Sequence, residues 1–314
     1  MKADSVLPIV PGAPSLDAIA EPMLVDPEPT LLAAVVEAYR AAAPALVDPA
    51  LDELRTAAET GGDPLAPLSE LPTLTVLADE RVVDRFTDRF RSASRLAALI
   101  EAGVCRVLTG IATQPNPVLV GEAEGCVLVP IGVDTDGSDP KEAIDVARDV
   151  DRWASIGDDP ALRELYTSLV DEADGISEYG IRTPSRHRVY GAFRSRCGAE
   201  LADDVIRSLG VDPEPAGDDQ YAESRTRAYA VGVSHGALDG DLRRACEDAG
   251  VGSRSTFTRI KRELREAGLL TTESVPQPVG RPRERLVARG ALARADGKAL
   301  DPPTVVEAVR DGLS

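Results

Sequence analysis

The segment between residues 221 and 289 restricts the possible folds of this 314-residue chain more than any other segment. Three stretches with apolar residues at helical spacing follow one another closely, at 221–234, 238–248 and 253–267. Two extended stretches separated by a proline-rich loop come next, within 269–289. Three helices followed by a strand, a loop and a strand predict a winged helix-turn-helix.

The turn between the second and third of these helices contains residues that allow a sharp change of direction. Gly250 and Gly252 tolerate backbone conformations that other residues avoid, and Ser253 is a good N-cap for the third helix. The apolar face of that helix consists of three residues at helical spacing: Phe257, Ile260 and Leu264.

The opposite face of the third helix combines small polar and arginine side chains. Helical geometry places Ser255, Thr258, Arg259 and Arg262 there. Such a face suits the major groove of DNA, because arginine reads guanine or phosphate and hydroxyl groups reach base edges and the backbone. The predicted DNA-binding residues of this helix, flanks included, are Arg254, Ser255, Thr256, Thr258, Arg259, Lys261 and Arg262.

The loop between the two extended stretches is a second basic element. The sequence VGRPRER at 279–285 is expected to hold Arg281, Arg283 and Arg285 around Pro282 at the wing tip, where they would enter the minor groove. Two other interpretations stay open. A basic amphipathic helix is often only a solvated face, and a winged helix can also bind another protein.

The distribution of charge reconciles this prediction with a net charge of -18. Residues 222–298 contain about 15 basic and about 10 acidic side chains, so the acidic excess belongs to the rest of the chain. An acidic chain with many arginines and few lysines is typical of halophiles, whose proteins stay soluble in concentrated salt. We therefore expect a halophilic, cytoplasmic protein whose basic segment faces DNA.

The N-terminal half alternates between extended and helical patterns. Two apolar runs, 72–79 and 104–110, flank a helical stretch at 80–103, which predicts a βαβ unit with a parallel sheet. A helix is expected at 28–43 and a hairpin at 116–132. The fold class is thus an α/β N-terminal domain (βαβ plus hairpin), a helical connector and a C-terminal winged helix-turn-helix.

The same patterns predict the boundaries of the domains and linkers. We expect an irregular N-terminus at 1–24, an α/β sensor-like or dimerisation domain at 25–140, a helical connector at 141–211, a linker at 212–220, the winged helix-turn-helix at 221–298 and a C-terminal helix at 299–314. Helices within the connector are expected at 141–154, 160–173, 185–196 and 199–209.

Sequence features for catalysis are weak. Neither a GxGxxG nor a phosphate-binding P-loop motif follows the first strand, so Asp79 is best interpreted as a helix cap. His187 is expected at a surface or interface and His235 in a structural role. Four cysteines without a CxxC pair do not suggest a metal, and Cys105 and Cys126 fall in predicted strands. We expect no cofactor, no metal, no membrane segment and no enzymatic activity.

With these residues identified, the chain resembles the TbsP-type haloarchaeal transcription regulators. The resemblance is most specific over 252–270 and 275–286, where Arg259, Lys261 and the stretch 280–283 match the family pattern best. It implies a C-terminal DNA-binding domain behind an N-terminal domain. That N-terminal part is also similar to degenerate phospholipase D-like sensor domains. The catalytic HxK motif of those enzymes is absent, which implies sensing or dimerisation rather than hydrolysis.

Together these observations predict a sequence-specific transcription regulator that binds double-stranded promoter DNA. We expect a homodimer on a pseudo-palindromic site, partly because the C-terminal helix is apolar at Val305, Val306, Val309 and Leu313. A small-molecule effector is expected at the N-terminal domain. The alternatives are an enzyme whose N-terminal domain acts on a phosphorylated metabolite, and an adaptor that binds protein through its winged helix.

Overall fold

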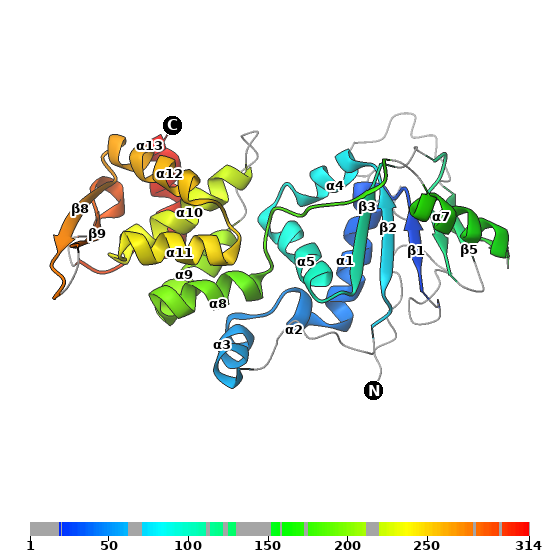
Figure 1. The fold of residues 1–314 in the computed structure, drawn as a ribbon, viewed down its shortest axis with the longest axis horizontal. Coiled ribbons are helices and arrows are strands. Elements are labelled where there is room, and N and C mark those ends of the chain that lie inside the picture. The colour runs from blue at the N-terminus through cyan, green and yellow to red at the C-terminus, as the bar shows by residue number, and fades with distance from the viewer. Residues whose placement is uncertain are drawn as a thin grey trace, which may run out of the picture. The chain divides into compact units, whose positions relative to one another are not determined.

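The computed structural model describes residues 19, 21–61, 71–110, 114–121, 125–129, 152–157, 159–172, 175–211, 220–278, 281–294 and 297–313. Internal contacts divide the chain into two compact units. Unit 1 comprises Met1–Val47, Leu65–Thr87 and Leu99–Gly180, and unit 2 comprises Asp48–Pro64, Asp88–Ala98 and Ile181–Ser314. Both units therefore contain stretches from distant parts of the sequence (Figure 1).

Unit 1 is built on a mixed sheet, which among the described residues has seven strands in the order β6-β5-β4-β1-β2-β3-β7. The three strands β1, β2 and β3 run parallel to one another, and the remaining pairs are antiparallel. The strands span Met23–Val25 (β1), Leu74–Ala78 (β2), Cys105–Thr109 (β3), Val118–Val120 (β4), Gly125–Val129 (β5), Arg152–Gly157 (β6) and Ser177–Glu178 (β7). The predicted parallel βαβ unit and the hairpin are both confirmed.

Helices cover both faces of this sheet. Tyr166 and Leu162 of α7 (Pro160–Glu172) pack against Met23, Val25 and neighbouring strand residues. Figure 1 shows α1 (Pro29–Ala42) on the other side of the sheet. This arrangement explains why the residues of β1, β2 and β3 are largely apolar on both faces, since each face is withdrawn from water.

The remaining helices of the N-terminal half are α2 (Pro44–Val47), α3 (Leu51–Thr60), α4 (Glu80–Thr87) and α5 (Phe90–Glu101). The boundary between the units falls within α5, and α3 belongs to unit 2. The stretch 80–103, predicted as helical, forms the two helices α4 and α5.

Unit 2 contains the C-terminal helices and the small sheet. Its further elements are α8 (Arg186–Cys197), α9 (Ala199–Leu209), α10 (Gln220–Ser234), α11 (Asp239–Ala249), α12 (Arg254–Glu266), β8 (Leu270–Val275), β9 (Arg283–Ala288), the 3₁₀ helix η2 (Gly290–Leu292) and α13 (Pro302–Leu313). One hydrophobic core joins them, and Leu54 of α3 lies in it with 1% exposure. Helices α8 and α9, expected as a connector, are thus packed into the same core as the winged helix.

Two expectations for secondary structure are wrong. Residues 23–25, expected at the edge of an irregular N-terminus, form β1 in the middle of the sheet, between β2 and β4. Residues 152–154, expected in a helix, belong to β6, where pairing with β5 overrides local helical preference. The rest of that expected helix, 141–151, and most of the linker at 212–220 lie outside the described residues.

The predicted C-terminal helix is confirmed, but its apolar face is buried within the same chain. Val305, Val306 and Val309 of α13 are at most 7% exposed, and two of them lie in the core of unit 2. Leu313, at 43% exposure, is the large apolar side chain of this helix that faces solvent.

Candidate nucleic-acid interface

The helix-turn-helix is formed by α11 and α12, with α10 packed behind them. Helix α11 ends at Gly250, whose φ of +78° places it in the left-handed conformation that favours glycine. Ser253 caps α12, because its side chain accepts a hydrogen bond from the backbone N–H of Thr256 at 3.4 Å. The two turn signals in the sequence therefore have the structural roles expected of them.

The two faces of α12 also lie as the sequence predicts. Phe257, Ile260 and Leu264 are at most 1% exposed and belong to the core of unit 2. The ring of Phe257 stacks on that of Tyr229 from α10, with 5.8 Å between the centroids. The outward side chains are exposed, and they are Arg254, Ser255, Thr258, Arg259, Arg262 and Arg265.

The outward arginines meet only weak internal competition for phosphate. Arg259 pairs with Glu263 at 2.7 Å, and Arg262 approaches Glu266 at 3.9 Å. All four side chains are about one-third exposed or more, so water screens both pairs and each contributes little to stability. The phosphates of a DNA backbone could therefore replace these carboxylates at small cost.

The hydroxyl groups at the start of α12 are already committed to local hydrogen bonds. Thr256 is half-buried, and its Oγ1 lies 3.0 Å from Ser253 Oγ. Thr258 Oγ1 donates to the carbonyl of Arg254 and accepts from Arg243 Nη1, each at 2.9 Å. Thr258 is thus an exposed side chain whose position is fixed from α11.

Lys261, predicted on the flank of the outward face where phosphates would pass, is buried instead. Lys261 is 9% exposed. Its Nζ donates to Asp239 Oδ2 at 3.0 Å and to Glu284 Oε2 at 2.6 Å. Burial of an ammonium group requires paired carboxylates, which α11 and β9 supply here. Lys261 therefore links α12 to the wing instead of presenting its charge to solvent.

Asp239 is the centre of this buried polar cluster. Its Oδ1 accepts from Tyr229 Oη at 2.5 Å and from Arg243 Nε at 3.0 Å, in addition to the contact with Lys261. The cluster joins α10, α11, α12 and β9, so it fixes α12 against its neighbours. We call Tyr229, Asp239, Arg243, Lys261 and Glu284 the Asp239 cluster.

The ionisation of the cluster follows from these contacts. Burial by itself would raise the pKa of Asp239, but hydrogen bonds from Tyr229 and Lys261 and the charges of Arg243 and Lys261 lower it overall. Burial and the adjacent carboxylate raise the pKa of Tyr229, so its hydroxyl stays protonated and donates. The cluster is therefore held as a charged carboxylate surrounded by donors.

The wing is the two-stranded sheet of β8 and β9. Arg281 is exposed in the loop between β8 and β9, whereas Arg283 and Arg285 lie in β9, so the prediction that all three sit at the tip is wrong. Their pairing with Val275 and Glu273 of β8 shortens the loop, because the extended pattern of β9 continues through the arginines. Val279 and Gly280 lie outside the described residues.

Contacts with the start of α11 hold the base of the wing. The N–H of Leu286 donates to the carbonyl of Ala237 at 2.9 Å, and Leu238 forms a β-bridge with Arg285. Arg283 Nη2 donates to Asp241 Oδ1 at 2.5 Å. Arg283 is therefore engaged in positioning the wing.

Sequence reasoning missed Tyr229, Asp239 and Arg243. Asp239 and Arg243 are four residues apart on one helix, which is the spacing of a helical ion pair. That spacing alone does not reveal Tyr229 or the buried partners from α12 and β9, because these meet only in the folded unit.

The remaining candidate residues have structural roles. Asp79 caps α4, as expected, since its Oδ1 accepts from the N–H of Arg81 at 2.8 Å. His187, expected at a surface or interface, is buried at 9% exposure. His235 Nε2 lies 2.9 Å from Asp204 Oδ2. Cys105 and Cys126 are buried, and burial raises the pKa of Cys105 to about 12, so its reactive thiolate is disfavoured.

Metal-binding and membrane-spanning features are absent from the part of the chain that the structure describes. It contains no group of three His, Cys, Asp or Glu side chains that could hold a metal ion. None of its helices is both long and apolar enough to cross a bilayer.

Comparison with protein families gives two matches. Residues 41–155 match the N-terminal model of the TbsP-like transcriptional regulators, and residues 185–310 match the model described as their C-terminal HTH domain. The second match begins at Ser185, the N-cap of α8, and extends into α13, so it includes the Asp239 cluster and the wing. No curated protein and no solved structure matches the chain.

Proposed function

Because the chain belongs to the TbsP-like transcriptional regulators, we propose that it binds promoter DNA sequence-specifically, with α12 in the major groove and the wing in the minor groove. The observation that supports this most is the exposed face of α12, where Ser255, Thr258, Arg259 and Arg262 stand away from an apolar core. Arg254 at the start of the helix is placed to contact phosphate.

The residues expected at the DNA take different roles in this proposal. We propose Arg259 and Arg262 as base or phosphate contacts from α12, and Arg281 and Arg285 as contacts from the wing, since all four are exposed. Ser253 and Thr256 keep the N-terminus of α12 capped. Lys261 and Arg283 act by holding α12 and the wing in position.

The test begins with genome-wide mapping of bound sites, which supplies a DNA fragment for affinity measurements. With that fragment, Arg259→Ala should weaken site-specific binding by about 1–3 kcal/mol and should relax the preference at one position. Arg281→Ala should weaken binding to specific and unrelated DNA alike and should reduce the salt dependence. The matched control is Arg310→Ala on α13, a surface arginine of unit 2, which should leave both affinities unchanged. Unchanged affinity in both Arg259→Ala and Arg281→Ala would contradict the proposal.

We also propose a homodimer on a pseudo-palindromic site, because two-fold regulators match the symmetry of such sites. The valines of α13 no longer support this interface, since they are buried within one chain. Sedimentation equilibrium with and without DNA tests the dimer, and a monomer in both conditions would rule it out. An effector at the N-terminal domain, a haloarchaeal origin and a cytoplasmic location stay predictions.

A further inference from the structure

The hydroxyl group of Thr258, exposed on α12, takes part in two hydrogen bonds whose direction is unambiguous. Its Oγ1 lies 2.9 Å from the carbonyl oxygen of Arg254, one turn earlier on the same helix, and 2.9 Å from Nη1 of Arg243 on α11. A carbonyl oxygen can only accept a hydrogen bond, and a guanidinium group can only donate one. The hydroxyl of Thr258 therefore donates its single hydrogen to Arg254 and accepts from Arg243.

These two contacts leave Thr258 with one kind of hydrogen bond to offer a ligand. A hydroxyl oxygen has one hydrogen and two lone pairs, and the contacts with Arg254 and Arg243 occupy the hydrogen and one of the lone pairs. The second lone pair is available at the exposed face of α12. Thr258 can therefore accept from a ligand, but it can donate only by breaking the hydrogen bond to Arg254.

Asp239 fixes the guanidinium group that imposes this direction. Arg243 Nε donates to Asp239 Oδ1 at 3.0 Å, and Arg243 Nη2 lies 2.9 Å from Asp239 Oδ2. This side-on pairing occupies one edge of the guanidinium group and leaves Nη1 directed at Thr258. The two side chains of the pair are 15% and 11% exposed, so water competes little with their contacts. Arg243 is therefore held in place whether or not DNA is bound.

Ser255, the other hydroxyl side chain of the predicted reading face, differs from Thr258 in this respect. Ser255 Oγ lies 2.8 Å from Ser253 Oγ, and either of these two hydroxyl groups could be the donor. Ser255 can therefore turn its hydrogen toward a ligand or accept from one at similar cost. The direction of the hydrogen bond to a ligand is fixed at Thr258 and adjustable at Ser255.

We infer that Thr258 accepts a hydrogen bond from the exocyclic amino group of an adenine or a cytosine in the major groove, and that Arg243 is the positioning residue that fixes this direction. Adenine N6 and cytosine N4 are the donors of the major groove, whereas the polar atoms of guanine and thymine there, like those of phosphate, are acceptors. The inference rests on the proposed binding of α12 in the major groove. It adds the class of base that one residue of this helix selects.

The first test measures base preference with the full chain. The duplexes contain a site obtained by genome-wide mapping, with each base pair changed in turn. Thr258→Val keeps the shape of the side chain and removes the hydroxyl group, so the preference at one position should fall about tenfold while the preferences elsewhere stay unchanged. The matched control is Thr56→Val on α3, at an exposed threonine that donates to the carbonyl of Asp52 at 2.8 Å in the same way. This control should keep every preference.

Base analogues identify the group that Thr258 contacts. Purine in place of adenine and 2-pyrimidinone in place of cytosine each lack the exocyclic amino group. One of these changes, at the position affected by Thr258→Val, should weaken binding of the parent chain about tenfold and leave Thr258→Val unaffected. If neither analogue does so, the inference is overturned. A preference that survives in Thr258→Val but is lost in Thr258→Ser would indicate a methyl contact with thymine, which also overturns it.

Arg243→Lys tests the positioning role. Lysine keeps a positive charge beside Asp239 but lacks the second arm that reaches Thr258, so the hydroxyl can turn and donate. The preference for the amino-bearing base should narrow about threefold or more, because bases with acceptors become tolerated. In the Thr258→Val background, Arg243→Lys should leave the preference unchanged. Equal weakening on all duplexes, with the preference intact in both backgrounds, would show a merely structural role and contradict the inference.

Failure of this inference is distinguishable from failure of the proposed function. If Arg259→Ala and Arg281→Ala leave the affinity for DNA unchanged, both proposals fail. If those two substitutions weaken binding but Thr258→Val alters no base preference, DNA binding stands and only the role of Thr258 is refuted.

Discussion

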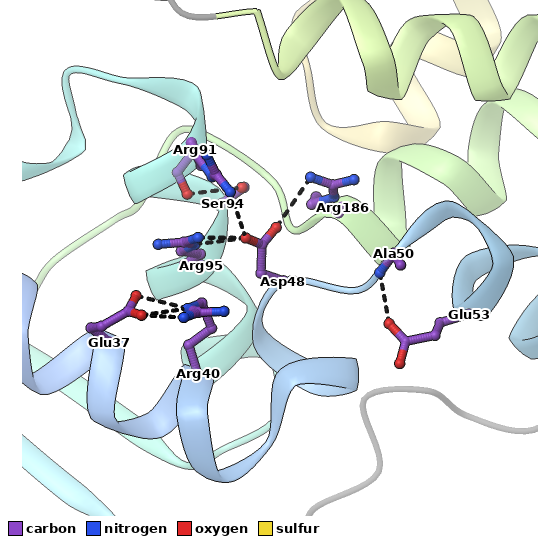
Figure 2. A network of polar contacts seen from close by, with 9 residues as sticks. All are labelled: Glu37, Arg40, Asp48, Ala50, Glu53, Arg91, Ser94, Arg95 and Arg186. Atoms are coloured by element: carbon purple, nitrogen blue, oxygen red, sulfur yellow. Dashed lines mark hydrogen bonds and ion pairs between the residues drawn. The ribbon is translucent and has the colours of Figure 1, made fainter.

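At the scale of single residues, two buried aspartates organise the cations of unit 2. Asp239 fixes α12 and the wing through Lys261, and Asp48 gathers arginines from α5 and α8. Both carboxylates are charged and buried beside positive groups, yet their surroundings differ. The carboxylate of Asp239 shares Lys261 of α12 with a second carboxylate, Glu284, whereas the carboxylate of Asp48 is contacted by arginines from two helices (Figure 2).

Replacing Asp239 should destabilise unit 2. Asp239→Asn keeps the shape of the side chain but removes the charge that faces Arg243 and Lys261, and breaking a buried ion pair in this way costs about 3–5 kcal/mol. Urea denaturation should show a lower midpoint. The matched change Asp311→Asn affects an exposed pair with Arg310 and should cost less than about 1 kcal/mol. Equal midpoints for Asp239→Asn and the parent chain would refute the structural role of the cluster.

The same carboxylates predict how stability responds to acid. Burial raises the pKa of Asp239 and of Asp48, but donors and nearby cations lower both below the ordinary value of 3.8. As pH falls, the unfolded chain therefore binds these protons first. The stabilisation is complete above the unfolded pKa and is lost as pH falls through the folded pKa. The free energy of unfolding, measured in urea at several pH values, should decline below about pH 4, and less steeply in Asp239→Asn. An unchanged slope in that variant would contradict the assignment.

At the scale of secondary-structure elements, α10 and α11 approach each other closely because of one glycine. A Cβ at Gly232 of α10 would lie 2.4 Å from Leu242 Cδ2, and Leu242 is fully buried on α11. The absence of a side chain at this position therefore lets the first and second helices of the motif pack together. Since Arg243 and Asp239 of α11 contact Thr258 and Lys261 of α12, this packing also influences the position of α12.

Gly232→Ala should separate these two helices. We expect a loss of about 1–3 kcal/mol, because overpacking displaces a buried leucine. Gly240→Ala on α11 is the matched control. No atom of the described residues would lie within 4 Å of a Cβ at that position, so higher helix propensity should stabilise the chain by about 0.5–1 kcal/mol. Thermal unfolding of both variants measures this, and a stabilising Gly232→Ala would exclude the close contact.

Elements with strong local signals could be predicted from the sequence, and elements defined by distant contacts could not. Helices α10, α11 and α12 have apolar periodicity and turn residues that specify them locally. Strand β1 has three residues between Pro22 and Pro27, too short for any periodicity, and its place between β2 and β4 depends on pairing alone. For the same reason, the exposed arginines of α12 were predictable, but the burial of Lys261 by Asp239 and Glu284 was not.

At the scale of the whole molecule, the C-terminal unit is not a continuous piece of chain. Its core includes Leu54 from α3, and Arg55 pairs with Asp203 of α9 at 2.5 Å. The second of these contacts joins residues that are 148 positions apart in sequence. The family match from residue 185 onward therefore covers the helix-turn-helix but omits a part of its packing.

Leu54→Ala should weaken the C-terminal unit although the substitution lies in the N-terminal third of the chain. Leu54 is 1% exposed, and a leucine truncated in a core costs about 2–5 kcal/mol. Hydrogen exchange should show faster exchange in α8 and α9, with which α3 packs. Leu165→Ala, at a position that is 54% exposed, is the control and should change nothing there. Unaltered protection in Leu54→Ala would show that α3 does not contribute to this core.

The discontinuity of unit 2 has a consequence for how the protein is made. A ribosome synthesises α3 and the start of α5 long before α8 to α13. These early segments therefore have no packing partners from unit 2 until the later helices have emerged. Unit 2 completes its core only after the last helix has emerged and the helices from α8 onward have packed with a helix synthesised much earlier. A truncated product that ends before α8 would expose Leu54 and the arginines of α5 without any means to read a promoter.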